Sequence, residues 1–212
     1  MIYDNIKRNK TNIVEVKNKV HISYVQGPTI NITGSKEATY KVEFLDKKTN
    51  IVHFQTEIKN NHWAKCNIQY FVDWKISVWE GDELFYEEEY NANDRRIYIA
   101  FDSKALGDSL AWFPYAEEFQ KKHSCKVVVS TFHNDMFMKQ YPNLEFVTPG
   151  DVVENLYAMY SLGLFYNENG SVNLYKNPQD PKSVTMQQMA TDILGLEYKE
   201  IKPKLQKRDV PK

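Results

Sequence analysis

The sequence predicts an α+β protein, in which an antiparallel β-sandwich is followed by an α/β domain built on a parallel sheet. Residues 11–90 contain alternating apolar and polar runs and no amphipathic stretch of helical length. After about residue 95, apolar runs of strand length alternate with helical patterns. Such βα units form parallel sheets through right-handed crossovers, so this change of pattern predicts two structural parts.

Short alternating runs separated by polar turns predict the strands of the first part. Two runs flank the turn at 46–50, two more flank Gly81, and an earlier pair flanks Gly27 and Pro28. The residues that share one face of these runs include Tyr40, Val42, Phe44, Val52, Phe54, Thr56, Ile58, Val72, Trp74, Ile76 and Val78. Several short strands with turns at this spacing indicate a small sandwich.

Strands and helices alternate in the second part. We expect strands at 97–101, 125–130 and 144–147, and helices at 108–123, 134–140 and 185–194. Asn134 is a favourable N-cap for the middle helix, and Gly195 suits the end of the last one. Pro114 lies well inside the first helical pattern, where we expect a kink or a lost hydrogen bond.

A polar, turn-rich segment at 90–96 separates the two parts. We therefore expect a sandwich domain at 1–94 and an α/β domain at 95–200. The remaining residues, 201–212, combine basic side chains with prolines, and we expect them to form a frayed tail.

Composition narrows the class of protein. The 212 residues carry a net charge of −1, so no basic field for nucleic acid is expected. The two cysteines, Cys66 and Cys125, show neither a disulfide framework nor zinc-ligand spacing. No apolar stretch has the length of a signal peptide core or a membrane helix. We expect a soluble, cytoplasmic protein without a membrane span.

An acidic residue stands where the strand at 97–101 passes through a short loop into a helix. Asp108 follows Gly107 at the expected helix start. One interpretation is an N-cap, which Asp fills well and which stabilises a helix by about 1 kcal/mol. The other is a general base at the mouth of a cleft, because open α/β sheets bind ligands beyond the carboxyl ends of their strands. One carboxylate can serve both roles.

Polar residues before Asp108 extend this candidate site. Asp102, Ser103 and Lys104 form the loop, and Gly107 permits close backbone approach or a positive φ. Lys104 either lies at the surface without a specific role, or it steers a phosphate or orients a carboxylate. Ser103 either binds a ligand or satisfies its own loop.

The loop after the second expected strand lies at the same edge of the sheet. It contains Thr131, His133 and Asn134. His133 could bind a hydroxyl group or move a proton, and a surface histidine without function is an equal alternative. None of the histidines has the spacing of metal ligands.

Residues 101–196 resemble the bacterial autotransporter heptosyltransferases, which are GT-B-type enzymes. The matching motifs, in order, are FDSKALGDSLAWFPYAEEF, STFHNDMF, YPNLEFVTPG, YAMYSLGLF and MQQMATDILGL. The strand-rich first part is also similar to the sandwich that these enzymes carry before their first Rossmann-like domain. The resemblance therefore covers most of the chain and is weakest before residue 20.

The resemblance implies transfer of heptose from a nucleotide diphosphate sugar, ADP-heptose-like, to an acceptor protein such as an autotransporter. It assigns the general base to Asp108 and lets Ser103, Lys104 and Gly107 frame the cleft. The chain stops before the family's second Rossmann-like domain, which holds most of the donor, so we expect no cofactor bound by this chain alone. The family's cysteine-bound iron site has no counterpart, and Cys66 and Cys125 cannot replace it.

Three hypotheses follow from the sequence. The first is the acceptor-side, N-terminal part of a glycosyltransferase, completed by a second Rossmann-like domain. The second is a non-catalytic module that binds a glycan or a protein, with Asp108 as a cap only. The third is an assembly role, in which the sandwich makes contacts between subunits of an oligomer.

Overall fold

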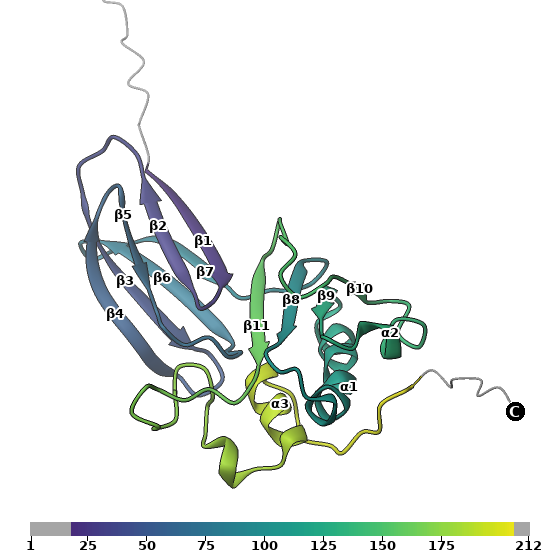
Figure 1. Cartoon of the computed structure of the whole chain (residues 1–212). Helices are drawn as coiled ribbons and strands as arrows, with labels where there is room; N and C mark the ends of the chain where they lie inside the picture. Colours follow the sequence, from purple (N-terminus) through teal and green to yellow (C-terminus); the bar gives the residue numbers. More distant parts are fainter. Residues whose placement is uncertain (1–17, 206–212) are drawn as a thin grey trace, which may run out of the picture.

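The structure is a computed structural model that describes residues 18–205, and it mixes strands with a smaller number of helices (Figure 1). In chain order the strands are β1 (Lys19–Val25), β2 (Thr29–Thr33), β3 (Thr39–Asp46), β4 (Ile51–Lys59), β5 (His62–Lys65), β6 (Trp74–Glu80), β7 (Glu83–Glu89), β8 (Arg96–Phe101), β9 (Lys126–Ser130), β10 (Glu145–Phe146) and β11 (Ala158–Leu162). The helices are α1 (Leu106–His123), α2 (Asn134–Phe137), the 3-10 turn η1 (Pro181–Ser183) and α3 (Met186–Leu194).

The first part contains an antiparallel sheet with the strand order β4-β3-β6-β7. Its alternation follows the sequence pattern, because Tyr40, Val42 and Phe44 of β3 are fully buried on one face. Val42 pairs with Val78 of β6, and Phe44 pairs with Phe54 of β4. This face packs against the antiparallel strands β1, β2 and β5, which lie across it in Figure 1.

A second sheet runs through both parts of the chain, with the order β10-β9-β8-β11-β1-β2-β5. Strands β8, β9, β10 and β11 pair in parallel, as the βα pattern predicts. β1 pairs antiparallel with β2 and also pairs in parallel with β11, where Tyr24 lies opposite Ala158. The sequence analysis did not predict that a strand of the first part extends the parallel sheet.

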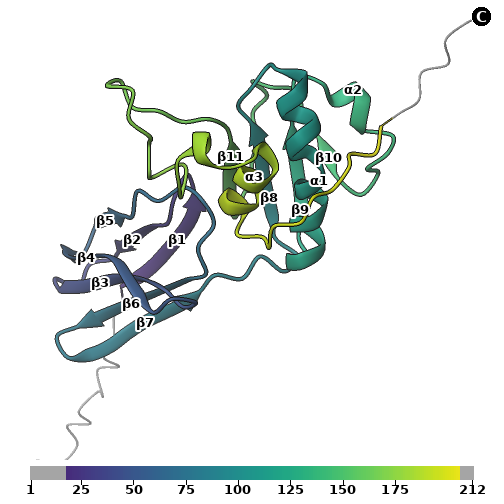
Figure 2. The ribbon, with the colours of Figure 1, turned by 90° about the horizontal axis from the view of Figure 1, so that it is seen from below.

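Two helices cover one face of the parallel strands. Figure 2 shows α1 and α3 side by side, and they contact each other as well as β9 and β11. Phe113 of α1 stacks on Phe137 with ring centres 4.0 Å apart and lies 4.6 Å from the ring of Tyr141. Trp112 and Phe119 are also fully buried. Burial of such rings stabilises the domain by roughly 1.5–3 kcal/mol each.

Helix ends differ from the sequence prediction in several places. α1 begins at Leu106, not at Asp108, and it continues past Pro114 to His123. Pro114 has no N–H to donate, so the hydrogen bond expected to be lost there is lost without ending the helix. α2 ends at Phe137, earlier than expected, and its N-cap is His133, so the N-cap assignment of Asn134 is wrong. α3 begins one residue late because Thr185 is its N-cap, accepting a hydrogen bond from the Gln188 amide at 3.1 Å.

Gly195 ends α3 as predicted. It has a φ of 62°, in the left-handed region, and its amide bonds to the Asp192 carbonyl. A side chain here would collide with Phe71, since an added Cβ would lie 2.1 Å from that ring. Both the conformation and the packing therefore require glycine.

Part of the expected frayed tail is held against α1. The Lys204 amide donates to the Tyr141 hydroxyl at 3.0 Å, and the Lys204 ammonium forms an ion pair with Glu117 at 2.8 Å. Gln187 of α3 donates to the Ile201 carbonyl at 2.9 Å. Residues 206–212 of the expected tail lie outside the described residues, as do residues 1–17 of the expected sandwich. No helix within 18–205 is both long and apolar enough to cross a membrane.

Candidate functional site

The parallel sheet has a topological switch point between β8 and β11. The chain builds β8, β9 and β10 in order toward one side, then returns to add β11 on the other side of β8. The loops that follow the parallel strands therefore meet at one edge of the sheet, which we call the carboxyl edge. In open α/β sheets, this is where ligands bind. The carboxyl edge contains every site residue that the sequence predicted.

Asp108 is half-buried in the first turn of α1. Its Oδ2 accepts a hydrogen bond from the Ser103 hydroxyl at 2.6 Å, and the Ser103 oxygen in turn accepts from the Ala105 amide at 3.1 Å. Its Oδ1 has no hydrogen-bond partner among residues 18–205. One oxygen is thus held in place while the other is available to a substrate.

The N-cap interpretation of Asp108 is wrong. The N-cap of α1 is Ala105, which makes no side-chain capping bond, and Asp108 is the third helical residue. The physical reason is the short bond from Ser103, which fixes the carboxylate against the preceding loop. The carboxylate therefore does not satisfy a free amide at the helix end.

Gly107 does not need the backbone freedom of glycine. It lies inside α1 without a left-handed φ, so the positive φ expected as one possibility for Gly107 is not found. A Cβ added at Gly107 would meet nothing within 4 Å. This leaves open space beside the first turn of the helix, close in sequence to Asp108. The neighbouring Leu106 side chain is exposed at the same place.

Lys104 and His133 connect the two loops. The His133 Nε2 lies 3.0 Å from the Lys104 carbonyl oxygen. The Lys104 ammonium sits 5.4 Å from the ring centre of Phe132, in a cation–π contact. Lys104 itself is exposed, as is Phe132. The structure therefore brings the two predicted loops together, and Phe132 joins them as a residue that sequence reasoning missed.

Thr131 and Asn134 hold the loop that follows β9 through hydrogen bonds within that loop. The Thr131 amide donates to Asn134 Oδ1 at 3.0 Å, and the His133 amide donates to Thr131 Oγ1 at 2.8 Å. The Asn134 side chain also donates to the Val147 carbonyl at 2.7 Å, which ties this loop to the end of β10. These bonds explain why Asn134 does not cap α2, because its oxygen already serves the loop.

Asp102 continues the pairing of β8 with β11. Its backbone amide donates to the Leu162 carbonyl at 2.8 Å. Its side chain is exposed and has no hydrogen bond or ion pair with the described residues. Asp102 thus adds a second carboxylate to the carboxyl edge.

Asn177 is a structural residue of the site that the sequence analysis missed. It is fully buried, its Oδ1 accepts from the Phe165 amide at 2.9 Å, and its side-chain amide donates to the Gly163 carbonyl at 3.0 Å. These bonds hold the loop that follows β11, on the far side of the switch point. An asparagine in a turn-rich stretch gives no sequence signal for such a role.

The described residues do not form a metal centre. No group of three or more His, Cys, Asp or Glu residues within 18–205 is arranged to hold a metal ion. Cys66 and Cys125 are both buried and unpaired, and burial raises the pKa of each thiol. Thiols with raised pKa values are poor metal ligands.

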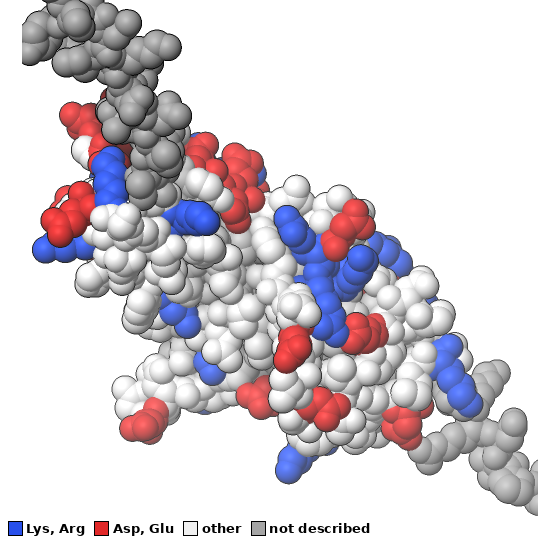
Figure 3. Space-filling view, turned by 90° about the horizontal axis from the view of Figure 1, so that it is seen from above, with Lys and Arg blue, Asp and Glu red and all other residues white. Residues whose placement is uncertain are grey.

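Charge is mixed on the surface at the opposite end of the parallel strands. Figure 3 shows basic side chains among acidic ones on the face seen from above. Arg96, at the start of β8, forms an ion pair with Glu145 and donates to the Glu154 carbonyl.

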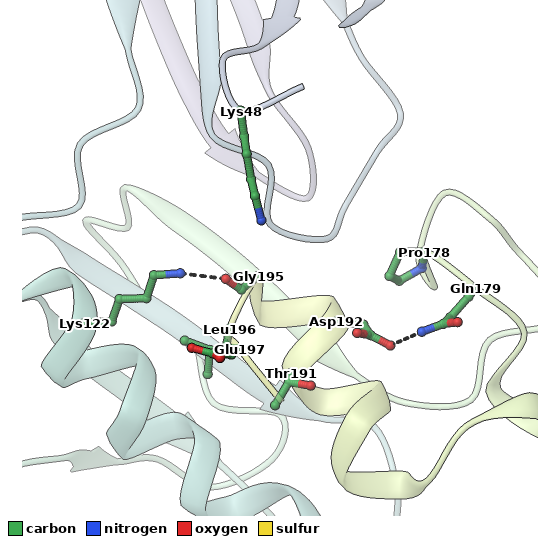
Figure 4. A pocket seen from close by; sticks show the side chains of 9 residues that line it. All are labelled: Lys48, Lys122, Pro178, Gln179, Thr191, Asp192, Gly195, Leu196 and Glu197. Carbon is green, nitrogen blue, oxygen red and sulfur yellow. Dashed lines mark hydrogen bonds between the residues drawn. The ribbon is translucent and has the colours of Figure 1, made fainter. Parts of the chain in front are cut away.

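A hollow in the structure lies away from the carboxyl edge. This hollow of about 620 Å³ lies near the C-terminal ends of α1 and α3, where Lys48, Lys122 and Asp192 line it (Figure 4). Since α1 starts at the carboxyl edge and ends near this hollow, the two places are at opposite ends of the helix. Asp108 does not line the hollow.

Comparison with known proteins gives a consistent set of relatives. The chain is 34% identical to the autotransporter heptosyltransferase BAHTCr of Citrobacter rodentium and 32% identical to TibC of Escherichia coli, over 77% of its length in each case. It is also 31% identical, over 66% of its length, to BimC of Burkholderia thailandensis, which is named an inactive autotransporter heptosyltransferase. No family model matches the chain.

Solved structures agree with the sequence relatives. The crystal structure of TibC, described as an iron-containing dodecameric glycosyltransferase, superposes with a TM-score of 0.79 and 26% identity. The match covers 91% of this chain and 50% of TibC. TibC in complex with ADP-D-β-D-heptose matches with a TM-score of 0.78. The chain spans about 40% of the length of the curated relatives BAHTCr and TibC. The chain is thus a relative of the autotransporter heptosyltransferases and corresponds to one part of them.

Proposed function

We propose that this chain is the acceptor-side part of a GT-B glycosyltransferase that moves a heptosyl group from ADP-heptose to a protein hydroxyl. Within it, 1–94 forms the β-sandwich and 95–200 the Rossmann-like domain. The observation that carries the proposal is the oriented carboxylate of Asp108 at the open switch point of the parallel sheet. The relatives supply the reaction class, and the TibC complex supplies the donor.

Asp108 acts as the general base in this proposal. Its free Oδ1 takes the proton of the acceptor hydroxyl as that oxygen forms a bond to the anomeric carbon of the heptose. The bond between that carbon and the diphosphate oxygen breaks, and ADP leaves with the electron pair. A carboxylate within hydrogen-bond reach of the hydroxyl contributes roughly 10²–10⁴-fold to such a step. Ser103 keeps Oδ2 occupied and so directs Oδ1 to the substrate.

The surrounding residues position the substrates. The exposed side chains of Asp102 and Lys104 and the open space beside Gly107 face the acceptor or the charged donor. His133 is a third contact, because its ring lies against the Lys104 carbonyl at the same edge. Thr131 and Asn134 act indirectly, since their bonds hold the loop that carries His133.

The remaining features of the proposal concern the whole enzyme. A second Rossmann-like domain binds most of the ADP-heptose and closes over the carboxyl edge. The acceptor is an autotransporter-like protein, and the reaction takes place in the cytoplasm, where nucleotide sugars are available. TibC is described as dodecameric, and we extend self-association to the protein that contains this chain.

One observation favours a second function. BimC, a relative at 31% identity, is named an inactive heptosyltransferase. A chain with this fold can therefore persist without catalysis, as a module that binds a protein or a glycan. In that case the Ser103–Asp108 bond only stabilises the start of α1, and an Asp108 variant would leave the function unchanged.

A chimera tests the proposal. This chain replaces the matched part of TibC, and heptose transfer to an autotransporter acceptor is followed by intact-protein mass spectrometry. We expect transfer by the chimera and a loss of at least about 100-fold with Asp108→Asn, because asparagine can still accept the Ser103 bond but cannot take a proton. The melting temperature should change little.

Asp135→Asn is the matched control. Asp135 lies in the first turn of α2, at the same edge of the sheet, so the variant removes an equivalent charge next to a helix start. We expect near-normal transfer. Full activity of a folded Asp108→Asn chimera would exclude the base role and favour the binding module.

A further inference from the structure

A polar hollow of about 620 Å³ separates the β3–β4 turn from the C-terminal ends of α1 and α3. Figure 4 shows Lys48 extending from the turn and Lys122 extending from α1 toward this space. Asp192 and Gln179 lie on its other side, and Leu196 adds an apolar wall. The volume is in the range of sites that hold a small ligand.

Within 18–205, the two lysines of the hollow form no salt bridge, whereas their neighbours in sequence do. Lys47 pairs with Glu89 at 2.6 Å, and Lys121 pairs with both Glu117 and Glu118 at 3.1 and 2.9 Å. Within 18–205, Lys48 forms no ion pair, and the Lys122 ammonium donates only to the Gly195 carbonyl, at 2.6 Å. The hollow therefore contains two ammonium groups without a salt bridge to the described residues, and its lining also contains the carboxylates of Asp192 and Glu197.

Electrostatics at Lys122 supports this description. Partial burial lowers the pKa of the Lys122 ammonium, and the positive charge of Lys48 lowers it further, while the nearby Asp73 carboxylate acts in the opposite direction. An anion between the two ammonium groups would remove this penalty and would accept their free N–H donors. Lysine is a common ligand of phosphate groups for the same reason.

The far side of the hollow offers a hydrogen-bond acceptor. The Asp192 carboxylate accepts a hydrogen bond from the Gln179 side chain, and burial raises the pKa of the carboxyl group. Only Oδ2 of Asp192 is used in that bond, so Oδ1 can accept from a hydroxyl group. The two lysine ammonium groups thus lie on one side of the hollow, and a hydrogen-bond acceptor, the Asp192 carboxylate, lies on the other side.

We propose that this hollow binds a small phosphorylated polyhydroxyl compound, with its phosphate between Lys48 and Lys122 and its hydroxyl groups toward Asp192. The ligand would join the β3–β4 turn to α1 and α3. The inference does not depend on the proposed function, because the hollow lies at the end of α1 remote from Asp108.

Calorimetric titration of the chain with ribose 5-phosphate, inorganic phosphate and ribose tests the proposal. We expect ribose 5-phosphate to bind more tightly than phosphate, and ribose not to bind. Lys48→Gln should weaken binding of both phosphates at least about tenfold, which is about 1.4 kcal/mol. Asp192→Asn should reduce the advantage of ribose 5-phosphate over inorganic phosphate.

Lys59→Gln is the control, since Lys59 ends β4 at the opposite end of the same hairpin. It removes the same charge and should leave binding unchanged. Lys48 is exposed in a turn, so its variant should fold normally, and circular dichroism checks this. Absence of phosphate binding at millimolar concentration, or equal weakening by Lys48→Gln and Lys59→Gln, would overturn the proposal.

Discussion

The two ends of α1 differ in how their charged groups are used. At the N-terminal end, Ser103 holds Asp108, His133 contacts the Lys104 backbone, and the space beyond is open. At the C-terminal end, Lys122 faces a hollow whose lining also contains Lys48, Asp192 and Glu197. The first end has groups that are oriented by hydrogen bonds beside an open space, and the second encloses side chains of both charges.

The topology explains this difference. The switch point between β8 and β11 directs loops outward at the carboxyl edge, where a second domain can complete the site. The other end is enclosed because the β3–β4 turn of the antiparallel sheet approaches α1 and α3 there. Enclosure by the chain itself therefore does not coincide with the edge at which we propose the reaction.

Removal of the Asn177 side-chain bonds should have the largest effect on stability. Asn177→Leu leaves the Phe165 amide and the Gly163 carbonyl without partners in a buried place, at a cost of about 3 kcal/mol. Asn169→Ala, in the exposed part of the same loop, should cost less than about 1 kcal/mol. Urea unfolding measures both. Equal small effects would show that the loop after β11 is not held as described.

Acidification should destabilise the opposite end of α1 through His123. The centre of its ring lies 4.4 Å from the ring centre of Phe119 and 5.0 Å from that of Phe71. Burial lowers the pKa of His123 from 6.5 to about 4, and the charge of Lys122 is a second cause. Between these pH values the unfolded chain binds the proton and the folded chain does not, so stability falls as pH falls. We expect a loss of about 2 kcal/mol, reduced from the full shift by partial solvent exposure.

His123→Phe isolates this contribution, because phenylalanine keeps the ring contacts and cannot be protonated. Unfolding free energies at pH 7 and pH 4 should differ less in the variant than in the parent chain. An identical decrease in both proteins would mean that other groups cause the acid sensitivity.

Gly107→Ala should give the smallest effect and a gain in stability. The residue is helical, and an added methyl meets no atom within 4 Å, so alanine should stabilise α1 by roughly 0.5–1 kcal/mol. Gly170→Ala is the contrasting control, because Gly170 has a φ of 79° and alanine is strained there. In the TibC chimera, Gly107→Ala should slow transfer by narrowing the open space. A stabilised variant with unchanged transfer would place the acceptor elsewhere.

Local patterns predicted much of the fold. Strands were predicted from the alternation of Tyr40, Val42 and Phe44 and from the apolar run that ends at Phe101. A strand that is buried on one face or on both has a pattern of apolar residues that can be recognised within a few neighbouring positions. The pairing of β1 with β11 could not be predicted in the same way. It joins Tyr24 to Ala158, and no local rule specifies partners so distant in sequence.

The candidate site was predicted in its location and not in its bonding. The βα pattern placed Asp108 and His133 at one sheet edge, which the parallel register confirms. Propensity favoured Asp108 as an N-cap, but the contact with Ser103 overrode it. The sequence did not predict the structural role of Asn177 or the role that we propose for Lys48, because both depend on segments that only the tertiary fold brings together.

The most direct test of whether the carboxyl edge binds the acceptor is an NMR titration. Amide chemical shifts of this chain are recorded while a hydroxyl-bearing segment of an autotransporter is added. We predict that the largest changes fall on residues 102–108 and 131–134, with little change at Lys48 and Lys122. Changes confined to the hollow between those lysines, or spread evenly over the two sheets, would contradict the account.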